Sequence, residues 1–522
     1  MVDFVSYQQM YSKSPLESDS VPMSEALAQL KVRLNNVHYL NSVNNLLGWD
    51  QQTMMPEGAQ ATRAAQTSTI SRLSHEMFSS PEIGALIDTA AAHTTSLSYD
   101  SNDAALLRIV QRDYERAVKV PAELVAEISS TAAFAHGAWV QARAENKFEL
   151  FAPWLEKIVK LNQRLAKAIG YTDHIYDALI DQYEPGMTTA NVTAMFADIK
   201  REVVPMIAHI SQNQGRASDD VLHRFYAEAK QESFTLRLAR GYGFDFARGR
   251  QDRAVHPFCQ SMSPDDVRLT TRYDEHFLQA ALFGTLHETG HGLYEQGVSH
   301  DLHPMMATGI SLGVHESQSR LWENVVGRSR GFWNRFYPEL QAEFPESLGD
   351  VSLETFYGAI NTSKPSFIRV EADEVTYNMH TMLRFEIECD LLTNELSVAD
   401  APAAWNSKMQ AYLGITPPTD ALGILQDVHW SGGMMGYFPT YTIGNLLSAQ
   451  LYEAATRAVA SIPADIEHGQ FDTLLAWMRT NIHQYGRNYL PQELVKRATG
   501  EPLSSRAYIA YLKAKYGEIY NF

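Results

Sequence analysis

Apolar residues recur every three or four positions over long stretches of this chain, and this spacing limits its fold more than any other feature. Leu27, Leu30 and Leu34 form one such series, and Leu106 and Val110 begin another. The spacing places each series on one face of an α-helix, and other elements must cover that face. The sequence therefore predicts a mainly α protein with helices of roughly 15 to 25 residues.

Proline and glycine residues mark the ends of the expected helices. Pro121 stands where a first helical turn tolerates proline, and Pro153 and Gly170 enclose a further apolar stripe. The clearest strand candidate is 267–273, where apolar and β-branched residues alternate with polar ones after a turn sequence. We expect a small sheet there, immediately before a helix, and draw no firm domain boundary.

Charge and cysteine content exclude several classes of protein. The chain has 522 residues and a net charge of −18, which repels phosphate backbones and anionic lipid. We therefore expect neither nucleic acid nor membrane as a partner. Cys259 and Cys389 are too few for a disulfide framework, and neither a signal peptide nor a long apolar span is recognisable. These features predict a cytoplasmic location.

The segment His287-Glu288-Thr289-Gly290-His291 lies within a predicted helix over 274–297, with Asp274 as its N-cap and Gly297 as its C′ residue. Two histidines four residues apart share one helix face, so both imidazoles can reach one zinc ion. Glu288 lies beside that face and can act as general base on a zinc-activated water. Gly290 is costly inside a helix unless another element approaches it closely.

A hydrolytic zinc site needs a third protein ligand and one open position. Tyr294 and Gly297 stand where a metzincin would have glycine and histidine, so that subclass is excluded. The remaining pattern is a carboxylate on a second helix, which we expect over 310–327. Glu316 and Glu323 are its candidates, and an ion pair with Arg320 is the structural alternative for Glu316.

Several short motifs surround this helix in one order. They are segments 49–56, 183–188 and 256–258, D-x-R-x-T at 266–270, I-R-x-x-A-D at 368–373 and G-x-x-Q-D-x-H-W at 423–430. Together they resemble the carboxypeptidase Taq family of zinc metallocarboxypeptidases over nearly the whole chain. The resemblance implies one catalytic unit over 1–522, with an elongated, saddle-shaped helical body, a deep groove and a small β-sheet near the metal. Two helical lobes flanking the groove are one arrangement that such a catalytic unit can have.

The resemblance also implies a homodimer and assigns residue roles. His287, His291 and Glu316 would bind Zn²⁺, with Co²⁺ as a substitute, and Glu288 would be the base. Arg369 is the candidate for binding the free carboxylate of a peptide, since arginine binds that group through two parallel hydrogen bonds. Its structural alternative is an internal pair with Glu371 or Asp373. The further candidates for substrate binding or oxyanion stabilisation are His256, His429, Tyr441 and Arg268.

Removal of single residues from peptide C-termini, with broad specificity, is the function that these motifs favour. A zinc endopeptidase or oligopeptidase would use the same three ligands without a carboxylate-binding arginine. A zinc aminopeptidase is disfavoured, because no Gly-Ala-Met-Glu-Asn segment is present. A non-catalytic peptide-binding protein would have no need of Glu288 beside an open metal position.

Overall fold

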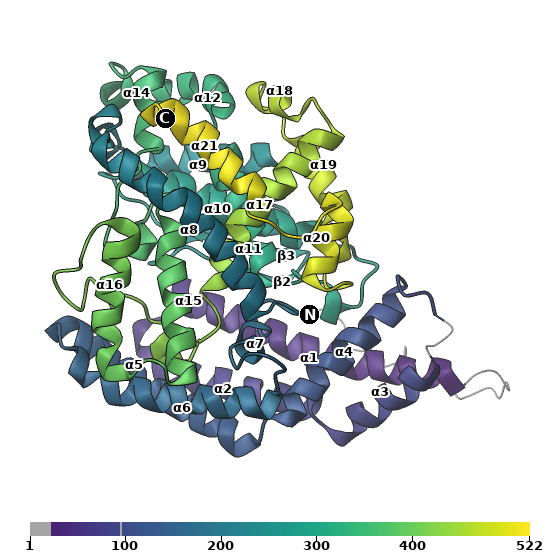
Figure 1. The fold of residues 1–522 in the computed structure, drawn as a ribbon. Helices are drawn as coiled ribbons and strands as arrows, with labels where there is room; N and C mark the ends of the chain where they lie inside the picture. The colour runs from purple at the N-terminus through teal and green to yellow at the C-terminus, as the bar shows by residue number, and fades with distance from the viewer. Residues whose placement is uncertain (1–21, 94–96) are drawn as a thin grey trace.

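A computed structural model describes residues 22–93 and 97–522 of the chain, and over these ranges the protein is mainly helical with one three-stranded sheet. Figure 1 shows the N-terminal helices as a layer along one side of the molecule. They are α1 (Pro22–Thr53), α2 (Gln60–Phe78), α3 (Pro81–His93), α4 (Asn102–Lys119), α5 (Ala122–Glu145) and α6 (Ala152–Ile169).

The remaining helices form the larger part of the molecule (Figure 1). Those of the central part are α7 (Asp177–Ile180), α8 (Thr189–Gln212), α9 (Glu228–Tyr242), α10 (Leu278–Gly297), α11 (Leu312–Arg320), α12 (Arg330–Glu343), α13 (Pro345–Leu348) and α14 (Leu353–Ile360). Those of the C-terminal part are α15 (Tyr377–Thr393), α16 (Ala401–Leu413), α17 (Pro439–Ala458), α18 (Ile462–Glu467), α19 (Asp472–Asn481), α20 (Pro491–Thr499) and α21 (Arg506–Tyr520). The expected mainly α class is confirmed.

The apolar stripes recognised in the sequence are buried. Leu30 and Leu34 of α1 pack in one hydrophobic cluster with Leu106 and Val110 of α4. Helix α6 ends at Ile169, and Gly170, which follows it, has a φ of 93° that ends the helical path of the backbone. A positive φ is readily available to glycine, which explains the residue at this end.

Two larger hydrophobic clusters are present, one of which includes residues of α5 and α6 from the N-terminal layer, and α17 contributes to both. Ile443 and Leu446 belong to the cluster built with α6, α8 and α15, whereas Leu447 and Leu451 belong to the cluster around α10 and the sheet. Leu446 and Leu447 are about 100° apart around the helix axis, so two neighbouring faces of one buried helix serve the two clusters. Helix α17 therefore connects the elements packed around α15 with those packed around α10.

The sheet has the order β1-β3-β2, with β1 (Gly249–Arg253) parallel and β2 (Cys259–Ser263) antiparallel to β3 (Asp266–Thr271). The predicted strand is confirmed, although it ends two residues early. Val267 and Leu269 are buried against the elements around α10. The sheet thus supports the helix that carries the His-Glu-Thr-Gly-His segment.

The predicted ends of that helix are wrong at both sides. Helix α10 begins at Leu278 after Phe277, and the Asp274 carboxylate accepts from the His276 amide within a preceding turn. Gly297 is the last helical residue rather than the residue after it. A Cβ at Gly297 would lie 2.5 Å from Nδ1 of His483, so packing, and not helix termination, requires glycine there.

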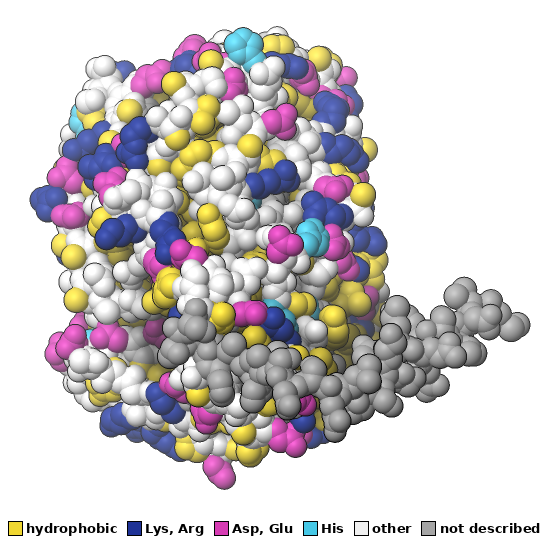
Figure 2. All heavy atoms as spheres, turned by 90° about the vertical axis from the view of Figure 1, so that its right-hand side faces the viewer, with side chains coloured by type: hydrophobic (Ala, Val, Ile, Leu, Met, Phe, Trp, Pro, Cys, Tyr) yellow, Lys and Arg dark blue, Asp and Glu magenta, His cyan; other side chains and the backbone are white. Residues whose placement is uncertain are grey.

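On the face shown in Figure 2, Lys and Arg side chains are interspersed with Asp and Glu side chains over the described residues. In the described ranges no helix has the length and apolar character needed to cross a bilayer. The two cysteines are both unpaired.

Substitution of Gly290 tests the packing of α10. A Cβ there would lie 2.5 Å from the backbone oxygen of Gln318, which cannot move aside independently. We expect Gly290→Ala to destabilise the protein by about 1–3 kcal/mol, measured as a fall in Tm. Gly137→Ala in the exposed part of α5 is the control: nothing lies within 4 Å of its Cβ, so about 0.5–1 kcal/mol of stabilisation is expected. Equal Tm values for the two variants would contradict this packing.

Candidate metal centre and active site

Helices α10 and α11 bring three metal-binding side chains to one point. Nε2 of His287 and Nε2 of His291 each lie 3.6 Å from Oε2 of Glu316. Ligand atoms around a tetrahedral zinc ion are about 3.3 Å apart when each bond is about 2.0–2.1 Å. The three residues form a group that could hold a metal ion. Two nitrogen donors and one carboxylate also match the donor set of a hydrolytic zinc site.

The close approach of these helices depends on two glycines. At Gly290 a Cβ would lie 2.7 Å from Cα of Ser319 in α11, and at Gly444 of α17 it would lie 2.6 Å from Cβ of Glu316. The expectation that another element approaches Gly290 is therefore confirmed. Helix α11 lies between α10 and α17: the backbone of Gln318 and Ser319 occupies the space beside Gly290, and the side chain of Glu316 begins in the space beside Gly444.

The two carboxylates proposed as rival ligands have separate positions. Glu323 lies in the π-helical continuation of α11 (Leu321–Val326), and its Oε2 is 2.8 Å from Nδ1 of His287. A hydrogen bond from Nδ1 fixes the tautomer in which Nε2 is free to bind a metal. Arg320 donates from Nε to Oε1 of Glu316 at 2.7 Å. The ion pair between Arg320 and Glu316 is therefore present, and it uses Oε1 of Glu316 while Oε2 faces the two histidines.

His291 is held by a longer chain of hydrogen bonds that the sequence did not reveal. Its Nδ1 is 2.6 Å from Nδ1 of His315, and Nε2 of His315 is 2.8 Å from Oε1 of Glu295. Glu295 lies one turn after His291 in α10 and also accepts from Thr308 and the Gly309 amide. The i,i+4 spacing of His291 and Glu295 was the available signal, but nothing in the sequence placed His315 between them.

Glu288 is buried beside this group, with only 6% of its surface exposed. Its Oε2 has no hydrogen-bond partner among the described residues. Burial raises the pKa of Glu288 to about 7, and the nearby carboxylates of Glu316 and Glu323 add to the rise against the effect of His287. A buried carboxylate oxygen without a partner is unusual, because desolvation is normally offset by hydrogen bonding.

Arg369 lies in a short 3₁₀ segment (Arg369–Glu371) and forms an internal pair with a residue that we did not predict. Asp427 Oδ1 accepts from its Nε at 3.0 Å and from its Nη2 at 2.8 Å, and Nη1 donates to the Tyr377 hydroxyl at 2.7 Å. The partner is thus Asp427 rather than Glu371 or Asp373. The opposite oxygen of Asp427 is bound by Arg384.

His429 and Tyr441 lie in the same cluster as Arg369. Nε2 of His429 is 3.4 Å from the Tyr441 hydroxyl, and Cζ of Arg369 is 4.9 Å from the centre of the Tyr441 ring. Burial, together with Arg369 and Arg384, lowers the pKa of His429 to about 4 despite the opposing charge of Asp427. His429 is therefore neutral at pH 7 and can act as a hydrogen-bond donor or acceptor.

The last two predicted site residues lie at the sheet. His256 is exposed in the loop between β1 and β2, and the adjacent Pro257 approaches Gly284 of α10. Arg268 of β3 pairs with Asp266 at 2.8 Å and lies over the Trp49 ring, with its Cζ 4.3 Å from the ring centre. The contact with Trp49 links the sheet to α1.

A helical protein built around a His-Glu-x-x-His helix, with a carboxylate from the next helix completing the group, is typical of metallopeptidases. The family model of the carboxypeptidase Taq (M32) metallopeptidases matches residues 29–516. The chain belongs to this family, and it is a metallocarboxypeptidase that hydrolyses peptides. Membership implies a divalent metal.

Known relatives agree over nearly the whole chain. Thermostable carboxypeptidase 1 of Thermus thermophilus is 41% identical over 493 residues, which cover 92% of this chain and 96% of that protein. Carboxypeptidase 1 of Bacillus subtilis is 39% identical, with 92% and 96% covered. The crystal structure of an M32 carboxypeptidase from Deinococcus radiodurans is similar with a TM-score of 0.92 at 41% identity, and covers 95% of this chain and 100% of that one.

The contact between Glu323 and His287 generates a test of metal binding. We expect Glu323→Gln to weaken Zn²⁺ binding by about 10- to 100-fold, because the neutral amide orients and polarises His287 less strongly. Competition with a chromogenic chelator measures this affinity without reference to activity. Glu343→Gln removes an ion pair with Arg237 at the surface and should leave the affinity unchanged. Unaltered affinity in Glu323→Gln would mean that this hydrogen bond does not support metal binding.

Proposed function

We propose that His287, His291 and Glu316 bind Zn²⁺ and that Glu288 is the general base in the release of single residues from peptide C-termini. The observation that carries this proposal is the convergence of three donor atoms within 4.8 Å of one another beside the unpartnered Oε2 of Glu288. Co²⁺ accepts the same nitrogen and carboxylate donors and is the proposed substitute for Zn²⁺. The contact between Nδ1 of His287 and Glu323, which leaves Nε2 of His287 free to bind a metal, supports the same assignment.

Zinc in this group would polarise the scissile carbonyl and acidify a water molecule. Oε2 of Glu288 accepts a proton from the attacking water, and the same carboxyl later donates it to the nitrogen of the departing amino acid. A pKa of about 7 suits both transfers near neutral pH. Burial of Glu288 keeps bulk solvent from competing for its proton.

Arg369 is the proposed anchor of the substrate's terminal carboxylate. Asp427 and Tyr377 hold its guanidinium group in one orientation, which lowers the entropy lost when a carboxylate binds. Tyr441 and His429 are beside it and can donate hydrogen bonds to the oxyanion that forms at the scissile carbonyl. His256 remains a candidate for contact with substrate from its exposed loop, and Arg268 for shaping the groove.

Broad specificity, homodimeric assembly and a cytoplasmic location belong to the same proposal. The unpaired Cys259 and Cys389 fit a reducing compartment. The substrates are peptides with free C-termini, and Arg369 recognises their shared carboxylate rather than one side chain.

Replacement of Glu288 tests the role of the base. We expect Glu288→Gln to reduce kcat by about 10²- to 10⁴-fold, since the amide cannot accept the proton. Mass spectrometry of a mixed peptide digest should show stepwise loss of C-terminal residues with the wild type only, and a chelator should abolish it. Metal content of the variant, measured by atomic absorption, should equal that of the wild type. Comparable turnover by Glu288→Gln would exclude Glu288 as the base.

Replacement of Arg369 tests the difference between an exopeptidase and an endopeptidase. Loss of charge-assisted hydrogen bonds to the carboxylate should lower kcat/KM on free peptides by about 10- to 100-fold in Arg369→Gln. The exposed Arg497, which pairs with Asp100 and Glu493, provides the control Arg497→Gln. Internal cleavage of C-terminally amidated peptides, at equal rates in wild type and Arg369→Gln, would assign the protein to the endopeptidases instead.

A further inference from the structure

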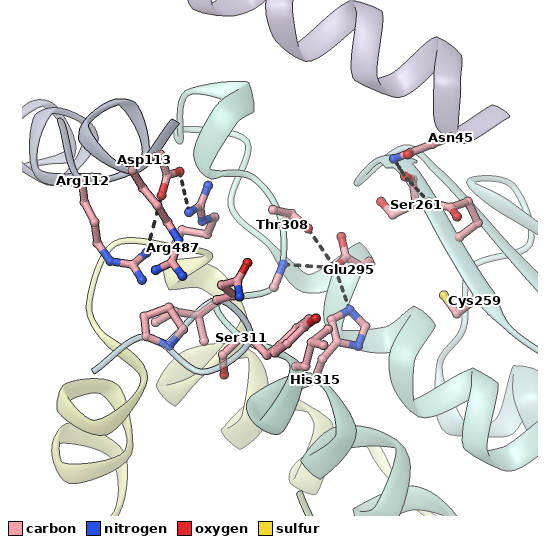
Figure 3. Close-up of a pocket in the computed structure, with 18 residues that line it drawn as sticks. Asn45, Arg112, Asp113, Cys259, Ser261, Glu295, Thr308, Ser311, His315 and Arg487 are labelled. Carbon is pink, nitrogen blue, oxygen red and sulfur yellow. Dashed lines mark hydrogen bonds and ion pairs between the residues drawn. The ribbon is translucent and has the colours of Figure 1, made fainter. Parts of the chain in front are cut away.

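We propose that a polar cavity beside the candidate metal centre is a subsite for an acidic side chain on the N-terminal side of the scissile bond. The cavity has a volume of about 530 Å³ and lies between the N-terminal helices and the segment around α11 (Figure 3). This inference rests on the proposed function, because it takes the bond to be cleaved at the His–His–Glu group and the terminal carboxylate to be bound at Arg369.

The cavity lies next to the metal-binding side of the proposed catalytic site. His315 lines it and is hydrogen-bonded to His291 at 2.6 Å. Tyr183 also lines it, and its ring centre is 5.2 Å from that of Tyr437. Tyr437 in turn contacts Tyr441, with ring centres 5.3 Å apart, next to Arg369. The proposal places the residues that precede the cleaved bond in this cavity, on the His315 side of the metal-binding group.

One end of the cavity is rich in arginine. Arg112 and Arg116 of α4 and Arg487 of the loop before α20 all line it. Figure 3 shows Arg112 and Arg487 around Asp113 at this end, whereas Asn45 and Ser261 lie at the other. This concentration of positive charge occurs in a chain whose net charge is −18.

The acidic residues nearby do not neutralise these three cations. Arg112 and Arg116 share Asp181, at 2.7 and 2.5 Å, and Arg487 pairs with Asp113 at 2.8 Å. Three guanidinium groups thus face two carboxylates, and one positive charge is in excess. Glu295, the other acidic residue of the wall, keeps its negative charge, because hydrogen bonds from His315 and the Gly309 amide lower its pKa despite burial. It lies beside His315 and away from Arg112 and Arg487 (Figure 3), so the excess positive charge is confined to the arginine end.

The excess charge selects the chemistry of the ligand. The side chains of Arg112, Arg116 and Arg487 are 30%, 20% and 23% exposed, so part of each guanidinium group reaches the cavity while solvent screening is reduced. A guanidinium group presents several donors in a plane that matches a carboxylate. The side chain of Asp or Glu is favoured here, and that of Lys or Arg is disfavoured by like charge.

A peptide series tests this subsite with the intact metal-loaded enzyme. Peptides of equal length and identical C-terminal residue would carry Glu, Gln or Lys at the second, third or fourth position from the C-terminus. We expect kcat/KM to be about fivefold higher for Glu than for Gln at one of these positions at low ionic strength, and lower for Lys. Added salt should reduce the difference, because the groups are partly exposed.

Two variants with opposite effects separate recognition from a structural role. Arg487→Gln removes the excess charge and should abolish the preference for Glu, whereas Asp113→Asn adds to the excess and should increase it. Arg506→Gln, which removes an exposed arginine paired with Glu453 and Glu501, is the matched control and should keep the wild-type preference. Impaired folding would lower kcat/KM for all peptides and leave their ratio unchanged.

The possible results are distinct. Loss of the Glu preference in Arg487→Gln together with its increase in Asp113→Asn supports the subsite. Equal cleavage of Glu and Gln peptides by the wild type, or a preference that neither variant changes, overturns it while the carboxypeptidase mechanism stands. Absence of C-terminal cleavage from every peptide of the series would instead contradict the proposed function itself.

Discussion

The close packing of α11 between α10 and α17 is the constraint on which the candidate site depends. Gly290 and Gly444 allow backbone contacts that a Cβ would prevent, and interior glycine costs each helix about 1 kcal/mol relative to alanine. The start of α11 is fixed from outside by the buried Glu184, which accepts from the Ser311 hydroxyl and the Gly313 amide. The position of Glu316 opposite the two histidines is thus set by backbone packing and not by its own side-chain contacts alone.

Charge balance explains why this packed site suits a cation. Glu288, Glu316 and Glu323 are all buried, whereas Arg320 and Arg328 are the two arginines paired with this carboxylate group. With both histidines neutral, as metal ligands must be, the set has one negative charge in excess, and an isolated buried charge is strongly unfavourable. Burial raises the pKa of Glu288 to about 7, which is the response expected of the carboxylate that lacks a partner.

Features that depend on local spacing could be predicted from the sequence, whereas those set by long-range contacts could not. The spacing of apolar residues predicts the helical class and strand β3. The cost of a glycine inside a helix predicts that another element approaches α10 closely at Gly290. The spacing of Glu316 and Glu323 placed both carboxylates on the correct face, but only the three-dimensional arrangement gives them different partners. Asp427 is 58 positions from Arg369 in sequence, so no spacing rule connects the two residues. Asp274 was assigned as a cap because its residue type suits that position, yet the chain forms a separate turn before α10 begins.

The residues around Arg369, namely Arg384, Asp427 and His429, have an excess of positive charge, whereas the candidate metal centre has an excess of negative charge. Arg369 and Arg384 both pair with Asp427, and His429, with a pKa lowered to about 4, adds no charge at neutral pH. One positive charge is therefore in excess among these residues, beside Tyr441. A metal ion would balance the excess negative charge at His287, His291 and Glu316, and a substrate carboxylate would balance the excess positive charge at Arg369. An amidated C-terminus or an internal peptide bond provides no such anion. The positive charge around Arg369 therefore favours a free C-terminus, whichever side chains the substrate carries.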